Sequence, residues 1–192
     1  MTTHHNIIQS SAAAAAVLIS LAAVFFTWSQ LQDSREHNRI SVRPILQITP
    51  YLEGAGPDKR NGIYLSNDGL GPAIIKSFSV KSSEVVASGF GPDRWAEIIA
   101  TTEANPLCFA SGWPKGETAI RAGTEVPLVY LTAAKPISDL CMAEVIKLIG
   151  GKAIDIEVAY ESIYEQAWHL KADSKIMSRS LDLQYRTLTN QR

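Results

Sequence analysis

The hydrophobic pattern divides the chain into one uncharged apolar run and a longer part in which short apolar runs alternate with polar turns. Ile7 to Trp28, IIQSSAAAAAVLISLAAVFFTW, has 22 residues and no charge. That length gives about 33 Å of α-helix, against about 30 Å of hydrocarbon in a bilayer. The pattern therefore predicts a transmembrane helix over residues 7–28, preceded by a short tail, residues 1–6. A cleaved secretory signal is the alternative, but the tail MTTHHN lacks Lys and Arg and the sequence FFTW at 25–28 is a poor cleavage site.

One face of this predicted helix carries small residues. They recur at i, i+4, i+8 and i+11 and are Ala12, Ala16, Ser20 and Ala23. Small side chains at this spacing allow a second helix to approach closely in lipid. An alanine-rich composition without any packing role explains the same residues equally well. The packing interpretation predicts two kinds of partner, the lipid bilayer and other membrane protein subunits.

The charges that flank the helix bear on its orientation. No Lys or Arg precedes it, whereas Arg35, Arg39 and Arg43 follow within about 15 residues, and flanking basic residues tend to stay on the cytoplasmic side. The count predicts a single-pass protein whose C-terminal domain lies in the cytoplasm, although single-span anchors with short N-termini often translocate the larger C-terminal part. In the cytoplasm Cys108 and Cys141 would be reduced thiols, whereas an oxidising compartment would allow them to form a disulfide.

After the helix the period changes. Residues 29–44 are polar and predict a helical stalk that ends at Arg43-Pro44, because proline disfavours the α region for its predecessor. Residues 45–192 contain short strand-like runs separated by turn residues. The clearest is Ile154 to Tyr160, in which apolar and polar residues alternate, and Trp168 to Ala172 predicts a strand that returns beside it.

Other segments complete the predicted domain. Val126 to Leu131 predicts a strand that Pro127 places at an edge or at a strand start, and Leu181 to Tyr185 predicts a last strand. Two helices, Asp93 to Glu103 and Ser138 to Ile149, are expected between strands. The predicted fold class is mainly β: an N-terminal transmembrane helix followed by an immunoglobulin-like β-sandwich with one or two inserted short helices.

The segment NDGLGP, residues 67–72, interrupts two strand-like runs. Asn67 can bond its own backbone in a turn, Gly69 and Gly71 permit positive φ, and Pro72 fixes φ where the next strand begins. A phosphate-binding loop would be followed by a helix, but the next residues, AIIKSFSV, are strand-like. We therefore expect a structural turn with positive φ at Gly69 or Gly71.

Three segments, in this order after an N-terminal span, carry a resemblance. They are HNRISVRPIL at His37 to Leu46, LSNDGLGPAIIKSF at Leu65 to Phe78, and VAYESIYEQAW at Val158 to Trp168. Together they resemble a broad group of bacterial single-pass membrane proteins of uncharacterised function. The Asn-x-Gly-x-Gly-Pro-Ala turn is similar to the Asn-Gly turn of CARDB-type immunoglobulin-like modules. The resemblance implies the bacterial inner membrane and a binding or spacer role, and it supplies no catalytic residue.

The charged and nucleophilic residues limit the chemistry. With 18 basic against 19 acidic residues the chain lacks the basic footprint of a nucleic-acid-binding protein. His169 is the one histidine of the β-domain. It could join Ser162 and Asp155 in a hydrolytic set, or the two cysteines in a zinc site, but the chain has no G-x-S-x-G elbow and no paired ligand spacing.

These observations favour a protein without catalytic residues, cofactor or metal. We expect a non-enzymatic, membrane-tethered interaction module that serves as an accessory subunit of a membrane protein assembly. A membrane-anchored hydrolase that uses His169 is the alternative.

Overall fold

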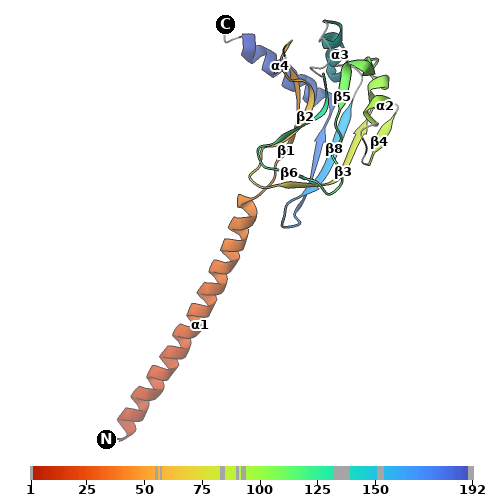
Figure 1. Ribbon diagram of the computed structural model, residues 1–192. Helices are drawn as coiled ribbons and strands as arrows, with labels where there is room; N and C mark the ends of the chain where they lie inside the picture. The colour runs from red at the N-terminus through yellow and green to blue at the C-terminus, as the bar shows by residue number, and fades with distance from the viewer. Residues whose placement is uncertain are drawn as a thin grey trace. The chain divides into compact units, whose positions relative to one another are not determined.

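The chain folds into two compact units, Met1–Ser41 and Val42–Arg192. The computed structural model describes residues 2–54, 56, 58–82, 85–89, 91, 94–131, 139–150 and 154–189. Within these ranges the fold is mainly β, with nine strands in two antiparallel sheets and four α-helices (Figure 1).

The first unit is a single helix, α1 (Thr2–Ser41). It is the one helix of the described chain that is long and apolar enough to cross a membrane, a property that an N-terminal signal sequence shares. The helix continues through the polar residues 29–41 because that segment contains no Pro or Gly. It ends shortly before Pro44, as the sequence predicts.

Two sheets form the second unit (Figure 1). Sheet A has the strand order β1 (Leu46–Leu52), β2 (Asn61–Asn67), β7 (Glu125–Leu131), β5 (Phe109–Ser111). Sheet B has the order β4 (Val86–Ser88), β3 (Ala73–Lys81), β8 (Asp155–Glu161), β9 (Ala167–Ala172), and the short β6 (Ala119–Ile120) pairs with β3 beside this path. All pairings are antiparallel.

Both sheets contribute to one hydrophobic core. Ile63 and Leu65 of sheet A and Ile75, Phe78 and Val158 of sheet B belong to the same buried cluster. The alternation predicted for residues 154–160 is confirmed, because successive side chains of β8 are buried and half-buried in turn. The predicted returning strand is β9, which pairs with β8 along its whole length.

The two predicted helices are confirmed as α2 (Arg94–Thr101) and α3 (Asp139–Gly150), although the predicted cap Ser138 lies outside the described residues. A short 3-10 helix, η1 (Pro106–Cys108), precedes β5. Pro127 does not mark an edge, because β7 lies between β2 and β5. The pairing register shifts beside Pro127, and a bulge is a position that tolerates proline inside a sheet.

The prediction of a last strand is wrong, since residues 174–189 form helix α4 (Ser174–Thr189). Asp173 caps this helix by accepting a hydrogen bond from the Ile176 amide, 2.8 Å away. Met177 is fully buried and Leu181 packs against the core one turn later. Leu183, which an alternating strand would place on the same face as Leu181, is exposed. The i, i+4 spacing of Met177 and Leu181 therefore indicates the structure better than the alternation of Leu181 and Leu183 does.

Candidate interaction surface

Three tyrosines meet on the outer face of sheet A. Ile63 and Leu65 of β2 point into the core, so Tyr64 between them faces outward and is absent from the core cluster. The Tyr64 ring contacts Tyr51 of β1, with ring centroids 5.4 Å apart, and Tyr130 of β7, with centroids 6.3 Å apart. Tyr64 is only 9% exposed, whereas Tyr51 and Tyr130 are half-buried. The outer face therefore carries a contiguous aromatic row across three strands.

Arg60 covers one end of this row. Its guanidinium lies 3.7 Å from the centroid of the Tyr51 ring, within cation–π range. The same group donates to Glu53 Oε1 from Nε at 2.9 Å and from Nη2 at 2.7 Å. Nη1 reaches Glu125 Oε2 at 3.2 Å. We call Tyr51, Tyr64, Tyr130, Arg60, Glu53 and Glu125 the tyrosine–arginine cluster.

The β1–β2 connection positions the charged members. Asn61 is buried, and its side chain accepts from the Gly54 amide at 3.2 Å and donates to the Gly54 carbonyl at 2.9 Å. The Glu53 amide also donates to the Arg60 carbonyl. Gly62 follows with φ +146°, and a Cβ there would lie 2.1 Å from the Val129 carbonyl oxygen. A glycine is required at this position, and it leaves the face between Arg60 and Tyr64 without a side chain.

The electrostatics of the cluster follow from this packing. Burial raises the pKa of the Tyr51 and Tyr64 phenols, and the Glu125 carboxylate raises both further. For Glu53, burial opposes ionisation, but hydrogen bonds from the backbone amide and guanidinium of Arg60 outweigh it, so that the pKa is lowered. The hydrogen bond with Glu53 raises the pKa of Arg60 above its usual value. Tyr51 and Tyr64 are thus neutral phenols at neutral pH, beside an ionised Glu53 and a charged Arg60.

Tyrosine and arginine are enriched at protein–protein interfaces and among their energetic hot spots. Here the rings already lie against one another and the guanidinium is held by two carboxylates. Binding of a partner would therefore cost little side-chain conformational entropy in this cluster. The Arg60 side chain remains 43% exposed, and those of Glu53 and Glu125 remain 26% exposed. The arrangement is suited to contact with another protein surface.

Sequence reasoning missed this cluster. Its members are separated by up to 79 positions, from Tyr51 to Tyr130, and only the strand order β1-β2-β7 makes them neighbours. The available signal was local: Tyr64 lies between two apolar residues that share one face of an alternating strand.

The predicted turn residues connect β2 to β3. Asn67 is fully buried, and its Oδ1 accepts from the amides of Ile45, at 3.2 Å, and Gly69, at 3.1 Å. Its Nδ2 donates to the carbonyls of Gly71, at 2.8 Å, and Ile120, at 2.9 Å. The single amide therefore uses all four of its hydrogen-bonding positions on the backbone of three separate segments.

The reason for the two glycines differs from the predicted one. Neither Gly69 nor Gly71 has φ in the left-handed region, so the expectation of positive φ is wrong. A Cβ at Gly71 would instead lie 1.8 Å from the Val42 carbonyl oxygen, and one at Gly69 would lie 2.4 Å from the Arg43 carbonyl oxygen. Close backbone approach is what requires glycine here. Pro72 directly precedes β3.

The predicted helix-packing face lies on α1. Ala16, Ser20 and Ala23 are exposed within this unit, and the side chain of Ala12 lies outside the described residues. The Ser20 hydroxyl donates to the Ala16 carbonyl at 2.8 Å, which satisfies it within the helix. The packing role of this face stays a prediction.

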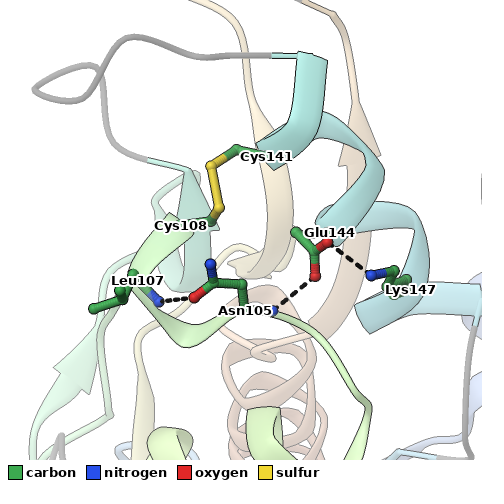
Figure 2. Close-up of a disulfide and its surroundings, with 6 residues drawn as sticks. All are labelled: Asn105, Leu107, Cys108, Cys141, Glu144 and Lys147. Atoms are coloured by element: carbon green, nitrogen blue, oxygen red, sulfur yellow. Dashed lines mark hydrogen bonds and ion pairs between the residues drawn. A yellow bond between two sulfur atoms is a disulfide. The ribbon is translucent and has the colours of Figure 1, made fainter.

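The two cysteines are joined in a disulfide between the end of η1 and the first turn of α3 (Figure 2). Of the two states that the sequence left open for these cysteines, the structure has the bridged one, and bridged cysteines cannot serve as zinc ligands. Beside the bridge, Glu144 Oε2 accepts from the Asn105 amide at 2.7 Å, and Glu144 Oε1 pairs with Lys147 Nζ at 2.8 Å. The hydrogen bond with Lys147 lowers the pKa of Glu144.

The residues of the alternative hydrolytic set are not brought together. Asp155 begins β8 and Ser162 directly follows its last residue, so the two lie about 23 Å apart at the rise of an extended strand. His169 is exposed, with Nε2 4.0 Å from Glu157 Oε2. Ser162 is buried, and its Oγ accepts from the Tyr164 amide in a turn whose next two residues are exposed. Among the residues that the structure describes, no group of His, Cys, Asp and Glu could hold a metal ion.

Comparisons with protein-family models, with curated proteins and with solved structures found no match.

Proposed function

We propose that this protein is a non-enzymatic, membrane-anchored interaction module, an accessory subunit of a larger membrane assembly, which binds a partner protein through the outer face of sheet A. The tyrosine–arginine cluster is the observation that carries this proposal. It combines aromatic area, a rigid guanidinium and exposed carboxylates on one face. The cluster contains two acidic groups and one basic group, so its net charge favours a partner surface that presents lysine or arginine.

We further propose that the β-domain is an immunoglobulin-like sandwich. In that fold strands A, B, E and D form one sheet and C, F and G the other, with C′ added beside C in some members. The order β1-β2-β7-β5 follows the first pattern, and β4-β3-β8-β9 follows the second. Residues of both sheets share one core, which supports face-to-face packing. Such domains frequently serve as binding modules on cell surfaces.

The disulfide supports placing the domain on the outer, oxidising side of the membrane. Thiols are kept reduced in the cytosol. A bridge between the buried Cys108 and the half-buried Cys141 therefore points to another compartment. The arginines that follow the span favour the opposite orientation. They are interleaved with Asp33 and Glu36 on a helical stalk. We give the disulfide more weight because disulfides are rare in reducing compartments.

Binding is tested by affinity capture of the full-length protein from native membranes. A variant with Tyr51→Ser and Tyr130→Ser removes the two half-exposed rings, and a matched variant with His169→Ser and Lys171→Ser alters the outer face of sheet B. We expect the first to lose a partner that the wild type and the second retain. A wild-type protein that elutes without partner, or equal capture by both folded variants, would overturn the proposal.

Orientation and anchoring are tested in intact cells. After mild reduction, a membrane-impermeant maleimide should label Cys108 and Cys141 before lysis, and unreduced protein should not be labelled. The intact mass should include α1. Labelling that needs lysis but no reductant would place the domain in the cytoplasm, and a mature protein that lacks the first residues would identify a cleaved signal.

A further inference from the structure

A groove opens where the chain crosses between the two sheets. After β5 the chain leaves sheet A, pairs with β3 of sheet B through β6, and returns to sheet A in β7. The concavity along this crossing has a volume of about 340 Å³. Trp113, Pro114, Ile120 and Val126 supply its apolar lining, and we call it the Trp113 groove. This volume lies within the range of sites that hold small molecules.

The apolar lining is held rigidly. The Trp113 ring packs edge-to-face on Phe78, with centroids 4.6 Å apart, and on Trp95, with centroids 5.7 Å apart. Its Nε1 donates to the Gly89 carbonyl at 2.5 Å. Pro114 and Ile120 are buried beside it. Because these side chains already occupy fixed positions, little ordering is required when a ligand enters.

Two equivalent turns place a cation at each end of β6. In Lys115–Thr118 and Arg121–Thr124, both the amide and the hydroxyl of the threonine donate to the carbonyl of the basic residue three positions earlier. The third residue of each turn is left-handed, with φ 58° at Glu117 and 69° at Gly123. The repeated geometry fixes the backbones of Lys115 and Arg121, which both line the groove.

The charge of the groove is one-sided. Lys115 and Arg121 are the charged residues of its lining, and no carboxylate pairs with either of them among the described ion pairs. Glu125 lies between two lining residues, Thr124 and Val126, but its side chain turns to the other face of the strand and binds Arg60. The groove thus combines an apolar floor with two cations that lack a described counter-ion.

We propose that the Trp113 groove binds a small organic carboxylate. The apolar body would lie on Trp113, Pro114 and Ile120, and the carboxylate would accept charge-assisted hydrogen bonds from Lys115 and Arg121. The apolar floor favours such a molecule over a small, fully hydrated anion, because burial of the body supplies binding energy that an inorganic ion lacks. This site is separate from the tyrosine–arginine cluster and does not depend on the proposed protein partner.

Fluorine NMR of a trifluoromethyl-phenylacetate probe tests the proposal, with the full-length protein in phosphatidylcholine nanodiscs and empty nanodiscs as the blank. We expect saturable broadening of the probe resonance and none for the neutral phenylacetamide analogue. Lys115→Gln and Arg121→Gln should each weaken binding about tenfold, or about 1.4 kcal/mol. Lys175→Gln, a surface lysine of α4 outside the groove, should leave it unchanged.

Ala119→Trp provides a second variant that leaves both cations in place. Ala119 lines the groove and is exposed, so an indole there should fill the space and abolish binding. Equal binding of acid and amide, no saturable signal up to the solubility of the probe, or unchanged affinity in folded Lys115→Gln and Arg121→Gln proteins would each overturn the proposal. Should Ala119→Trp not fold, the two glutamine variants still decide it.

Discussion

The outer faces of the two sheets are built by the same alternation and present different chemistry. On sheet B, Glu157 pairs with Lys171 at 3.2 Å and lies 4.0 Å from His169, and the three side chains are 41 to 57% exposed. On sheet A, tyrosine rings contact one another across three strands, and Arg60 bridges two carboxylates that are 26% exposed.

The difference shows how packing changes the energetic weight of similar residue types. Exposed ion pairs contribute little to stability, because solvent screens them and long side chains lose entropy on pairing. In the tyrosine–arginine cluster the Tyr51 ring covers one side of the guanidinium, and the two carboxylates form a connected network with it. We therefore expect substitutions on the outer face of sheet A to lower the free energy of unfolding, and those on the outer face of sheet B to leave it nearly unchanged.

The largest expected effect concerns the Cys108–Cys141 disulfide, which belongs to the sheet A side of the comparison. The disulfide closes a separation of 33 residues between η1, which leads into β5, and α3. Replacing both cysteines by serine should lower the free energy of unfolding by about 3 to 4 kcal/mol in the chain-entropy account. Denaturant unfolding measures this, and hydrogen exchange should show β5 opening before β9. An unchanged midpoint after full reduction would contradict the structural role of the bridge.

Tyr64→Ala should have the next largest effect. The ring is almost fully covered and contacts two neighbouring rings, so its removal should cost about 2 to 3 kcal/mol of stability. His169→Ala, the matched change on the face of sheet B, should stay within about 0.5 kcal/mol. Thermal unfolding of both variants measures the two losses of stability. Equal losses would show that the outer faces of the two sheets do not differ in this respect.

Arg60→Met tests the charged part of the cluster. Methionine keeps much of the aliphatic stem but loses both ion pairs and the cation–π contact with Tyr51. Because Arg60 is partly exposed and screened, we expect a loss of about 1 kcal/mol, within the range of partly exposed networks. Glu157→Gln on sheet B should be neutral by the same measurement. A larger effect at Glu157 than at Arg60 would reverse our ranking of the two faces.

The smallest effect is a dependence on pH. Tyr51 and Tyr64 have raised pKa values in the folded state, so their contribution is present below the unfolded value of about 10 and is lost as pH rises through the folded value. Glu53 has a lowered pKa, so its contribution is lost as pH falls through that folded value. Tyr51→Phe should flatten the alkaline decline in stability. A decline identical to that of the wild type would show that Tyr51 is not its source.

How far the sequence predicts the structure depends on whether the deciding contact is local. The burial pattern of β8 could be predicted because apolar and polar residues alternate within this one strand. Leu181 to Tyr185 suggested a strand because three apolar residues alternate there, and the decisive features, the Asp173 cap and buried Met177, lie outside that window. The requirement for glycine at position 71 could not be predicted, because it comes from the close approach of the Val42 carbonyl oxygen, which a single sequence does not reveal.

The candidate surface needs even more distant information. Tyr51, Tyr64 and Tyr130 become one row only after the strand order is known. The same holds for the disulfide, since the separation of its cysteines along the chain does not place η1 against α3. Nucleophiles and metal ligands carry local motifs more often than such surfaces do.

The most direct test of the central claim is site-specific photo-crosslinking of the full-length protein in its native membrane. Benzoylphenylalanine would replace Tyr51 or Tyr130 on sheet A and, as matched positions, His169 or Lys171 on sheet B. We predict one discrete, reproducible adduct from the two sheet A positions and none from the sheet B positions. Adducts of equal yield from both faces, or adducts from sheet B alone, would contradict the assignment of sheet A as the interaction surface.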